Sequence, residues 1–245
     1  MWMPVALFTI FINEPKQKQC MNIWFVIAAL NEEKHIPEVI KNLQKAGYRN
    51  IAVVDDGSKD DTAGAAEKAG ASVLKHVLNR GQGAALQTGM DFALEQGADV
   101  IVHFDADGQH RMEDLPAMLR PVLEGEVDVT IGSRFLKDAK SVPLFRRILL
   151  KGSVFVIWLF YGVRMTDAHN GFRVLSREAA EKIRITCDRM EHASEIIDLI
   201  HRKKLSFREV PVIINYSKET LARGHGSYLG ALRIFLKMLL RRFVQ

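Results

Sequence analysis

Short apolar runs alternate with longer amphipathic segments along most of this 245-residue chain. Apolar runs of about four to eight residues favour buried strands, and apolar residues repeating every three or four positions favour helices. The expected strands are 23–29, 51–56, 72–76, 99–105 and 127–133. The expected helices are 32–46, 60–69, 82–96 and 112–124. Strands that alternate with helices predict an α/β fold, in which helices flank both faces of a mostly parallel sheet.

One compact domain is expected, with a separate segment at each end of the chain. Residues 1–20 hold an apolar run that is short for a bilayer span, and no basic stretch precedes it as in a signal peptide. Because Met21 stands directly before the first expected strand, we predict an N-terminal extension over 1–20. The compact domain then covers residues 21–227, and residues 228–245 form a C-terminal amphipathic helix.

Two segments combine basic and apolar residues in a way that is typical of helices at a membrane surface. Residues 141–163 begin with basic side chains and continue as an apolar run, and the C-terminal segment places Arg233, Lys237 and Arg241 four residues apart. Neither segment is long and uncharged enough to span a bilayer. A helix with a basic stripe and an apolar face lies in the membrane interface. We therefore predict membrane-interface helices, with two core helices that expose a basic face as the alternative.

The charge balance narrows the classes of partner. The formal net charge of +5 implies attraction to something anionic. Aromatic residues are not interleaved with the basic ones as a base-stacking platform requires, so we predict no nucleic-acid binding. The two cysteines, Cys20 and Cys187, form neither a disulfide framework nor a metal-binding spacing, which fits a reducing compartment.

Polar side chains follow four of the expected strands at the point where each strand ends. In open α/β sheets, ligands bind outside the carboxyl ends of the strands. Polar groups gathered there predict a binding site rather than a solvated edge. The residues concerned are Asn31, Glu32, Asp55, Asp56, Asp105, Asp107, Ser133 and Arg134.

Asp105 and Asp107 end a buried apolar strand with only Ala106 between them. Two carboxylates at this spacing can share one divalent cation. Mg²⁺ and Mn²⁺ prefer oxygen ligands, and proteins commonly hold Mg²⁺ by few carboxylates plus substrate phosphates. The pair therefore predicts a site for a metal and a diphosphate. The structural alternative is a helix cap, supplied by Asp107 or Asp114.

Two further loops at the same edge could contact a nucleotide. In VVDDGSKDDT (53–62), Asp56 could accept hydrogen bonds from a base or a ribose, and Gly57 permits a tight turn. In NRGQGAALQTG (79–89), backbone amides at the start of a helix could face phosphate. An Asp-Gly turn without a ligand, and glycines that serve only helix packing, are the alternatives.

Several segments, taken in order along the chain, resemble the family-2 glycosyltransferases of the GT-A fold. The segments are AALNEE, VVDDGSKDDT, NRGQGAA, DADGQH, GSRF, TDAHNGFR and, more faintly, ARGHGS. Within that family the chain is most similar to polyprenyl-phosphate sugar synthases such as the dolichol-phosphate mannosyltransferases. The resemblance covers about Ile23 to Ser227. It implies a nucleotide-diphospho-sugar transferase (GT-A) domain over 21–227, with 141–163 as an inserted membrane-interface helix.

The resemblance also implies a role for particular residues. The residues implied around the nucleotide-sugar are Ala28, Leu30, Glu32, Asp56, Ala106, Arg223 and Ser227. Those implied at a Mg²⁺ or Mn²⁺ ion are Asp105, Asp107 and Gln109. Those implied at an acceptor phosphate are Arg134, Arg146 and Arg173, and the catalytic ones are Asp107, Arg134 and Asp167. The family usually has proline where Ala28 stands, which leaves the choice between UDP and GDP open.

Asp167 has two interpretations, a general base or an anchor that holds Arg173 and its loop. A phosphate monoester has a second pKa of about 6, so a lipid-phosphate acceptor is mostly dianionic at neutral pH. Such an acceptor needs charge neutralisation rather than a strong base. We therefore favour the positioning role for Asp167.

These expectations combine into an inverting, metal-dependent glycosyltransferase. It would move a hexose from a UDP- or GDP-sugar to a polyprenyl phosphate, as a peripheral protein on the cytoplasmic face of the membrane. The alternatives are a glycosyltransferase that extends a cell-surface glycan, and a non-catalytic nucleotide-sugar-binding partner of a membrane enzyme. A haloacid-dehalogenase-type phosphatase and a sugar-nucleotide pyrophosphorylase fit the motifs less well. Self-association and a small integral membrane subunit both stay open.

Overall fold

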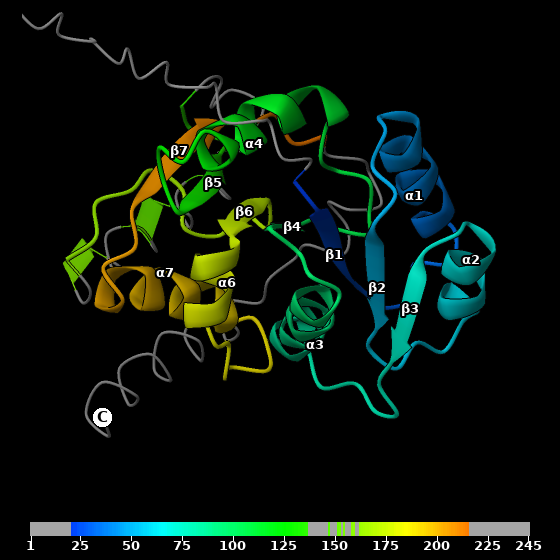
Figure 1. Ribbon diagram of the computed structural model, residues 1–245. Coiled ribbons are helices and arrows are strands. Elements are labelled where there is room, and N and C mark those ends of the chain that lie inside the picture. Colours follow the sequence, from blue (N-terminus) through cyan, green and yellow to red (C-terminus); the bar gives the residue numbers. More distant parts are fainter. Residues whose placement is uncertain are drawn as a thin grey trace, which may run out of the picture.

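The computed structural model describes residues 21–136, 147, 151–152, 154, 158–159 and 162–215 (Figure 1). The strands are β1 (Ile23–Ala29), β2 (Ile51–Asp55), β3 (Ser72–Lys75), β4 (Val100–His103), β5 (Val129–Ser133), β6 (Arg173–Ser176) and β7 (Phe207–Pro211). The helices are α1 (Ile36–Lys45), α2 (Thr62–Lys68), α3 (Gln82–Glu95), the 3₁₀ helix η1 (Met112–Asp114), α4 (Leu115–Leu123), α6 (Arg177–Lys182) and α7 (His192–Arg202).

The strands form one seven-stranded sheet with the order β3-β2-β1-β4-β6-β5-β7. Strand β6 is antiparallel to both of its neighbours, β4 and β5, and the other pairings are parallel. All strands except β6 therefore run in one direction and end at the same edge of the sheet. The predicted α/β fold with a mostly parallel sheet is confirmed.

Helices cover both faces of the sheet, as Figure 1 shows. Successive side chains of a strand point to opposite faces. Trp24 and Val26 of β1 accordingly pack with residues of α3, α6 and α7, whereas Phe25 and Ile27 pack with residues of α1, α2 and α4. Because both faces of β1 are covered, its sequence reads as a continuous apolar run instead of an alternation.

Local sequence explains where the helices lie. In α1, the buried residues Ile36, Val39, Ile40 and Leu43 repeat at helical spacing and face the sheet. The helix begins later than predicted because Pro37 lies in its first turn, the part of a helix that tolerates a missing N–H. In α3, a Cβ at Gly89 would lie 2.3 Å from Val26 Cγ1, so this glycine allows α3 to approach β1 closely.

Several predicted segments lie outside the described residues. These are the N-terminal extension 1–20, the C-terminal helix 228–245 and most of the interface helix 141–163. Among the residues that the structure does describe, there is no helix with the length and apolar character needed to cross a membrane.

Candidate active site

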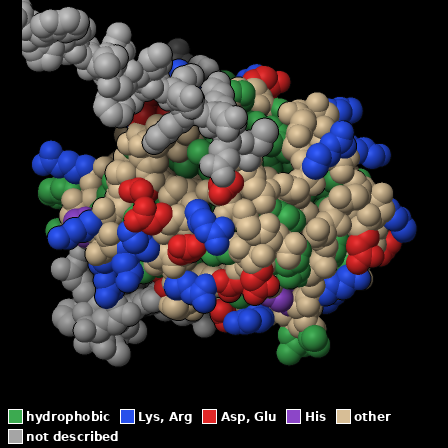
Figure 2. Space-filling model, in the orientation of Figure 1, with side chains coloured by type: hydrophobic (Ala, Val, Ile, Leu, Met, Phe, Trp, Pro, Cys, Tyr) green, Lys and Arg blue, Asp and Glu red, His purple; other side chains and the backbone are tan. Residues whose placement is uncertain are grey.

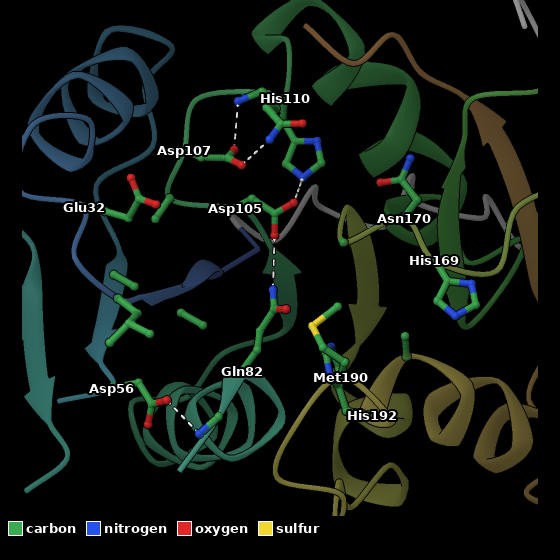
Figure 3. Close-up of a pocket in the computed structure, with 18 of the residues that line it drawn as sticks. Glu32, Asp56, Gln82, Asp105, Asp107, His110, His169, Asn170, Met190 and His192 are labelled. Atoms are coloured by element: carbon green, nitrogen blue, oxygen red, sulfur yellow. Dashed lines mark hydrogen bonds and ion pairs between the residues drawn. The ribbon is translucent and has the colours of Figure 1, made fainter. Parts of the chain in front are cut away.

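A cavity of about 560 Å³ lies at the sheet edge where β1, β2 and β4 end (Figure 3). Ligand sites commonly have volumes of roughly 300–1,000 Å³. The cavity brings together residues that are far apart in the chain. The predicted site residues that line it are Ala28, Leu30, Glu32, Asp56, Asp105, Ala106, Asp107, Gln109, Arg134 and Arg173.

Asp105 lies at the centre of this cavity and has two polar neighbours (Figure 3). Its carboxylate lies 2.8 Å from Nε2 of His110, and Nε2 of Gln82 donates to it at 3.4 Å. Burial alone would raise the pKa of Asp105, but the attraction of His110 and Arg173 holds that pKa below its ordinary value. Asp105 is therefore the carboxylate of the pair that stays ionised most readily.

Asp107 is in the opposite electrostatic situation. It accepts a hydrogen bond from the backbone amide of Gln109 at 3.1 Å and a second from the side-chain amide of Gln109. Burial and the negative charge of Asp105 together raise the pKa of Asp107. A cation bound between the two carboxylates would stabilise both of them as anions.

The donor set at this corner fits a hard divalent cation. Within the described ranges there is no cluster of three or more histidine, cysteine, aspartate or glutamate side chains that could hold a metal. Asp105 and Asp107 both line the cavity and could each offer a carboxylate, and waters or phosphate oxygens would complete the shell, which is a common arrangement for Mg²⁺. Gln109, predicted as a third ligand, directs its amide nitrogen to Asp107 and so positions that carboxylate.

Gly171 brings the backbone close to the acidic pair. A Cβ at this position would lie 2.6 Å from both carboxylate oxygens of Asp105. Real Cβ atoms do not approach other heavy atoms so closely. Only glycine therefore fits here without moving Asp105.

Asp56 organises the loop that leads into α3. Its carboxylate accepts hydrogen bonds from the backbone amides of Arg80 at 3.0 Å and Gly81 at 2.7 Å. It also lies 2.7 Å from Nδ1 of His76. An ionised carboxylate has about four acceptor positions, and these contacts occupy three of them. Asp56 lines the cavity as predicted, but most of its hydrogen-bonding capacity fixes the loop.

Glu32 lies on the same side of Asp105 as Asp56, whereas His169 and Asn170 lie on the other side (Figure 3). The Glu32 carboxylate contacts His35 Nδ1 at 2.9 Å, and its backbone amide donates to Thr62 Oγ1 at 2.8 Å. These bonds tie the loop after β1 to the start of α2. The cavity thus has one wall built from the first strand ends and another from the residues before β6.

Arg134 and Asp167 form a buried, two-point ion pair. The Nε and Nη2 atoms of Arg134 each donate to an Asp167 oxygen at 2.6 Å, and the backbone amide of Arg134 donates at 3.1 Å. Glu209 on β7 accepts from the backbone amides of Thr166 and Asp167 and so holds their loop. The residue that Asp167 anchors is therefore Arg134, whereas the sequence had suggested Arg173.

Arg173, the first residue of β6, lines the cavity and is 2% exposed. Its Nε and Nη1 atoms have no hydrogen-bond partner among the described residues, and neither has the side-chain nitrogen of Asn170. Burial lowers the pKa of Arg173 to about 10, and Asp105 and Asp167 oppose that shift. Buried donors in folded proteins normally have partners, so this wall is built to receive an acceptor of hydrogen bonds.

The cavity also contains residues that the sequence did not single out as site residues. The clearest are Gln82, His169, Asn170 and Met190. Asn170 lies within the TDAHNGFR segment, which the resemblance to the family includes. It is a polar residue to which no role was given, and its place in that segment could have identified it. The loop before α7 reaches the cavity only through the fold, because the backbone carbonyl of Asp188 accepts from the amide of Ala84 at 3.1 Å. The predicted residues Arg146, Arg223 and Ser227 lie outside the described part of the chain.

Comparison with known proteins gives a consistent result. Residues 24–184 match the family Glycosyl transferase family 2. A UDP-N-acetylglucosamine–dolichyl-phosphate N-acetylglucosaminyltransferase of Methanococcus voltae is 34% identical over 89% of this chain and 95% of its own length. A polyprenol monophosphomannose synthase of Mycolicibacterium smegmatis is 31% identical over 82% of this chain and 80% of its own.

Solved structures agree on the fold. The crystal structure of glucosyl-3-phosphoglycerate synthase from Mycobacterium tuberculosis, in complex with Mn²⁺, UDP and glucosyl-3-phosphoglycerate, superposes with a TM-score of 0.66. The match covers 91% of this chain and 80% of that chain, at 21% sequence identity. The predicted GT-A fold is therefore confirmed.

Proposed function

Because the chain belongs to glycosyltransferase family 2, we propose that it transfers a hexose from a UDP- or GDP-sugar to a polyprenyl phosphate. The relatives from Methanococcus voltae and Mycolicibacterium smegmatis have names that specify a dolichyl-phosphate acceptor and a polyprenol monophosphomannose product. These names agree on a lipid phosphate and differ in the sugar. They support the acceptor class and leave the sugar open.

One observation carries the proposal: the cavity combines an acidic corner with a wall of buried donors that have no partner in the described part of the chain. Asp105 and Asp107 form the corner, and Arg173 and Asn170 contribute the donors. A sugar transferase that acts on a lipid phosphate must bind two phosphate groups. The leaving diphosphate needs a cation, and the acceptor phosphate needs positive charge or hydrogen-bond donors.

On the donor side, Asp105 and Asp107, with Gln109 beside them, would hold Mg²⁺ or Mn²⁺. When bound, the ion would stabilise the negative charge that develops on the departing diphosphate. Asp56 fixes the loop at the start of α3 and faces the cavity, so it would border the nucleotide. The other residues proposed around the nucleotide-sugar are Ala28, Leu30, Glu32, Ala106, Arg223 and Ser227.

On the acceptor side, Arg173 would bind the acceptor phosphate with Asn170, and Arg146 and Arg134 would add positive charge. Asp167 would keep Arg134 oriented, since it binds that guanidinium at two points. The acceptor oxygen would then attack the anomeric carbon in line with the leaving group and invert its configuration. No protein base is required for this step, because a phosphate monoester is already mostly deprotonated at neutral pH.

We further propose that a GT-A domain over 21–227 works at the cytoplasmic face of the membrane as a peripheral protein. The segments 141–163 and 228–245 would contact the membrane interface. A second copy of the chain or a small integral membrane subunit remains a predicted partner.

A screen of radiolabelled UDP- and GDP-hexoses against short polyprenyl phosphates, with Mn²⁺ present, tests the proposal. We expect label in the lipid fraction from at least one donor. Asp107→Asn should abolish transfer while circular dichroism shows an unchanged fold. Arg173→Gln should raise the KM for the acceptor much more than the Kd for UDP, which titration calorimetry with and without Mn²⁺ measures. Transfer only to glycan acceptors, or an active and folded Asp107→Asn variant, would overturn it.

A further inference from the structure

The loop between β3 and α3 presents two adjacent apolar side chains to solvent. Val77 is 97% exposed and Leu78 is 75% exposed, which are the highest values among the exposed large hydrophobic residues of the described ranges. Single exposed apolar residues are ordinary on protein surfaces. A neighbouring pair that is almost fully exposed at the end of a loop calls for a partner. We call Val77 and Leu78 the β3–α3 tip.

The tip is held outward by fixed residues on both sides. Before it, His76 lies 2.7 Å from Asp56 Oδ1 and 3.0 Å from Thr88 Oγ1 through its two ring nitrogens. After it, the backbone amides of Arg80 and Gly81 donate to the same Asp56 carboxylate. Since both flanks are fixed, the tip is preorganised. Binding of the tip to a surface therefore costs little conformational entropy in the loop.

The tip stands at the edge of the sheet that carries the cavity. Strand β3 is parallel to β2, so the loop leaves the sheet where β1 and β2 also end. Asn79 and Gly81, which follow the tip, line the cavity. Figure 2 shows hydrophobic side chains projecting from the lower right of the molecule, at the position of the β3–α3 loop in Figure 1.

Other features of this edge suit a lipid surface. Leu30 and Met190 are exposed apolar residues that line the cavity. Lys75 precedes the tip and Arg80 follows it, with side chains that are 56% and 57% exposed. Their ion pairs with Glu67 and Asp188 are solvent-exposed and therefore weak. Apolar side chains flanked by exposed basic ones are typical of segments that lie in the interface of an anionic bilayer.

We propose that the β3–α3 tip inserts into the headgroup region of an anionic phospholipid bilayer and holds the cavity against it. This inference rests on the proposed function, because the phosphate of a polyprenyl phosphate lies at the bilayer surface and the cavity must come to it. The tip is a poor interface between two copies of the chain. Two side chains supply far less than the roughly 800 Å² per partner of a standard protein interface.

Vesicle binding by the full-length protein tests the tip directly. The variant combines Val77→Asp with Leu78→Asp, and the matched control is Met21→Asp, an exposed apolar residue just before β1 at the opposite edge of the sheet. In co-sedimentation with vesicles of phosphatidylcholine and phosphatidylglycerol, we expect the double variant to partition at least tenfold more weakly than wild type. The control should match wild type, and circular dichroism should show all three proteins equally folded.

Transfer assays separate membrane docking from chemistry. We expect the double variant to glycosylate a short, water-soluble polyprenyl phosphate within twofold of the wild-type rate. Its rate on a long polyprenyl phosphate embedded in vesicles should fall at least tenfold. If wild type transferred sugar to neither acceptor, the proposed function would fail, whereas sedimentation would still test the tip.

Two results would overturn the inference. One is equal vesicle binding by wild type and the double variant. The other is a wild-type dimer in analytical ultracentrifugation that the double variant fails to form, because the tip would then be a contact between copies of the chain.

Discussion

Removing either partner of the Arg134–Asp167 ion pair should destabilise the protein severely, and removing both should cost less than the sum. The two side chains share hydrogen bonds of 2.6 Å, and both are buried. Asp167→Asn removes the negative charge that Arg134 binds at two points. Arg134→Gln removes the guanidinium that binds the Asp167 carboxylate. Breaking a buried pair in this way costs about 3–5 kcal/mol.

The size of this loss is large against the whole stability of a domain, which is about 5–15 kcal/mol. The double variant contains no isolated buried charge, so the second substitution removes part of the penalty that the first one caused. We expect a coupling energy of about 1–3 kcal/mol between the two positions, at the upper end of the range for residues in contact. Urea denaturation followed by circular dichroism, on wild type and the three variants, gives the complete cycle.

The same cycle distinguishes an anchor from a general base. If Asp167 acts as a base, Asp167→Asn should lower kcat strongly while the free energy of unfolding stays near that of wild type. If it is an anchor, unfolding free energy and the KM for the acceptor should both change. Single variants that each lose under about 1 kcal/mol, with additive effects in the double variant, would refute the ion-pair reasoning.

Two further predictions follow from individual contacts. Gly171→Ala would place a Cβ 2.6 Å from the Asp105 oxygens, so we expect at least tenfold weaker Mn²⁺ binding in calorimetry with UDP present; unchanged affinity would show that Asp105 is free to move aside. Burial, reinforced by Arg173, lowers the pKa of His192 from 6.5 to about 4, so the folded protein keeps this imidazole neutral while the unfolded chain takes up a proton. The stability that neutral His192 contributes is therefore lost as pH falls from about 6.5 toward 4, at about 1.4 kcal/mol per pH unit. In the His192→Asn variant, the slope of unfolding free energy against pH should be smaller by that amount over the same range.

The central strands and the acidic corner were accessible from sequence because both depend on local pattern. Strand β1 occupies the predicted residues 23–29, since a strand covered on both faces is a continuous apolar run. Asp105 and Asp107 are recognisable because charges rarely follow such a run without a ligand or a cap. The ends of other elements shifted by a few residues, as with the predicted strand 99–105, which spans Val100–His103.

The cavity wall formed by β6 and the residues before it was less predictable from sequence, because it depends on contacts between distant segments. Strand β6 has four residues and begins with a buried arginine, so its apolar pattern is too short to identify a strand. Strand β7 alternates weakly, with one buried residue in five. The sequence did not identify the partner of Asp167 either, because both Arg134 and Arg173 were candidates. Only the fold brings Arg134, which is 33 residues away, into contact with Asp167.

The reversed direction of β6 explains how the cavity acquires its positive wall. A parallel strand between β4 and β5 would bring its last residue to the edge where β4 ends. Because β6 is antiparallel, its first residue lies there instead, and Arg173 pairs in register with His103, two residues before Asp105. The loop before β6 then brings Asn170 and Gly171 to the cavity, and its Asp167 binds Arg134. One inverted strand thus sets a buried guanidinium beside an acidic pair, and two of its nitrogens have no partner among the described residues. This arrangement suits the two phosphate-bearing substrates that we propose.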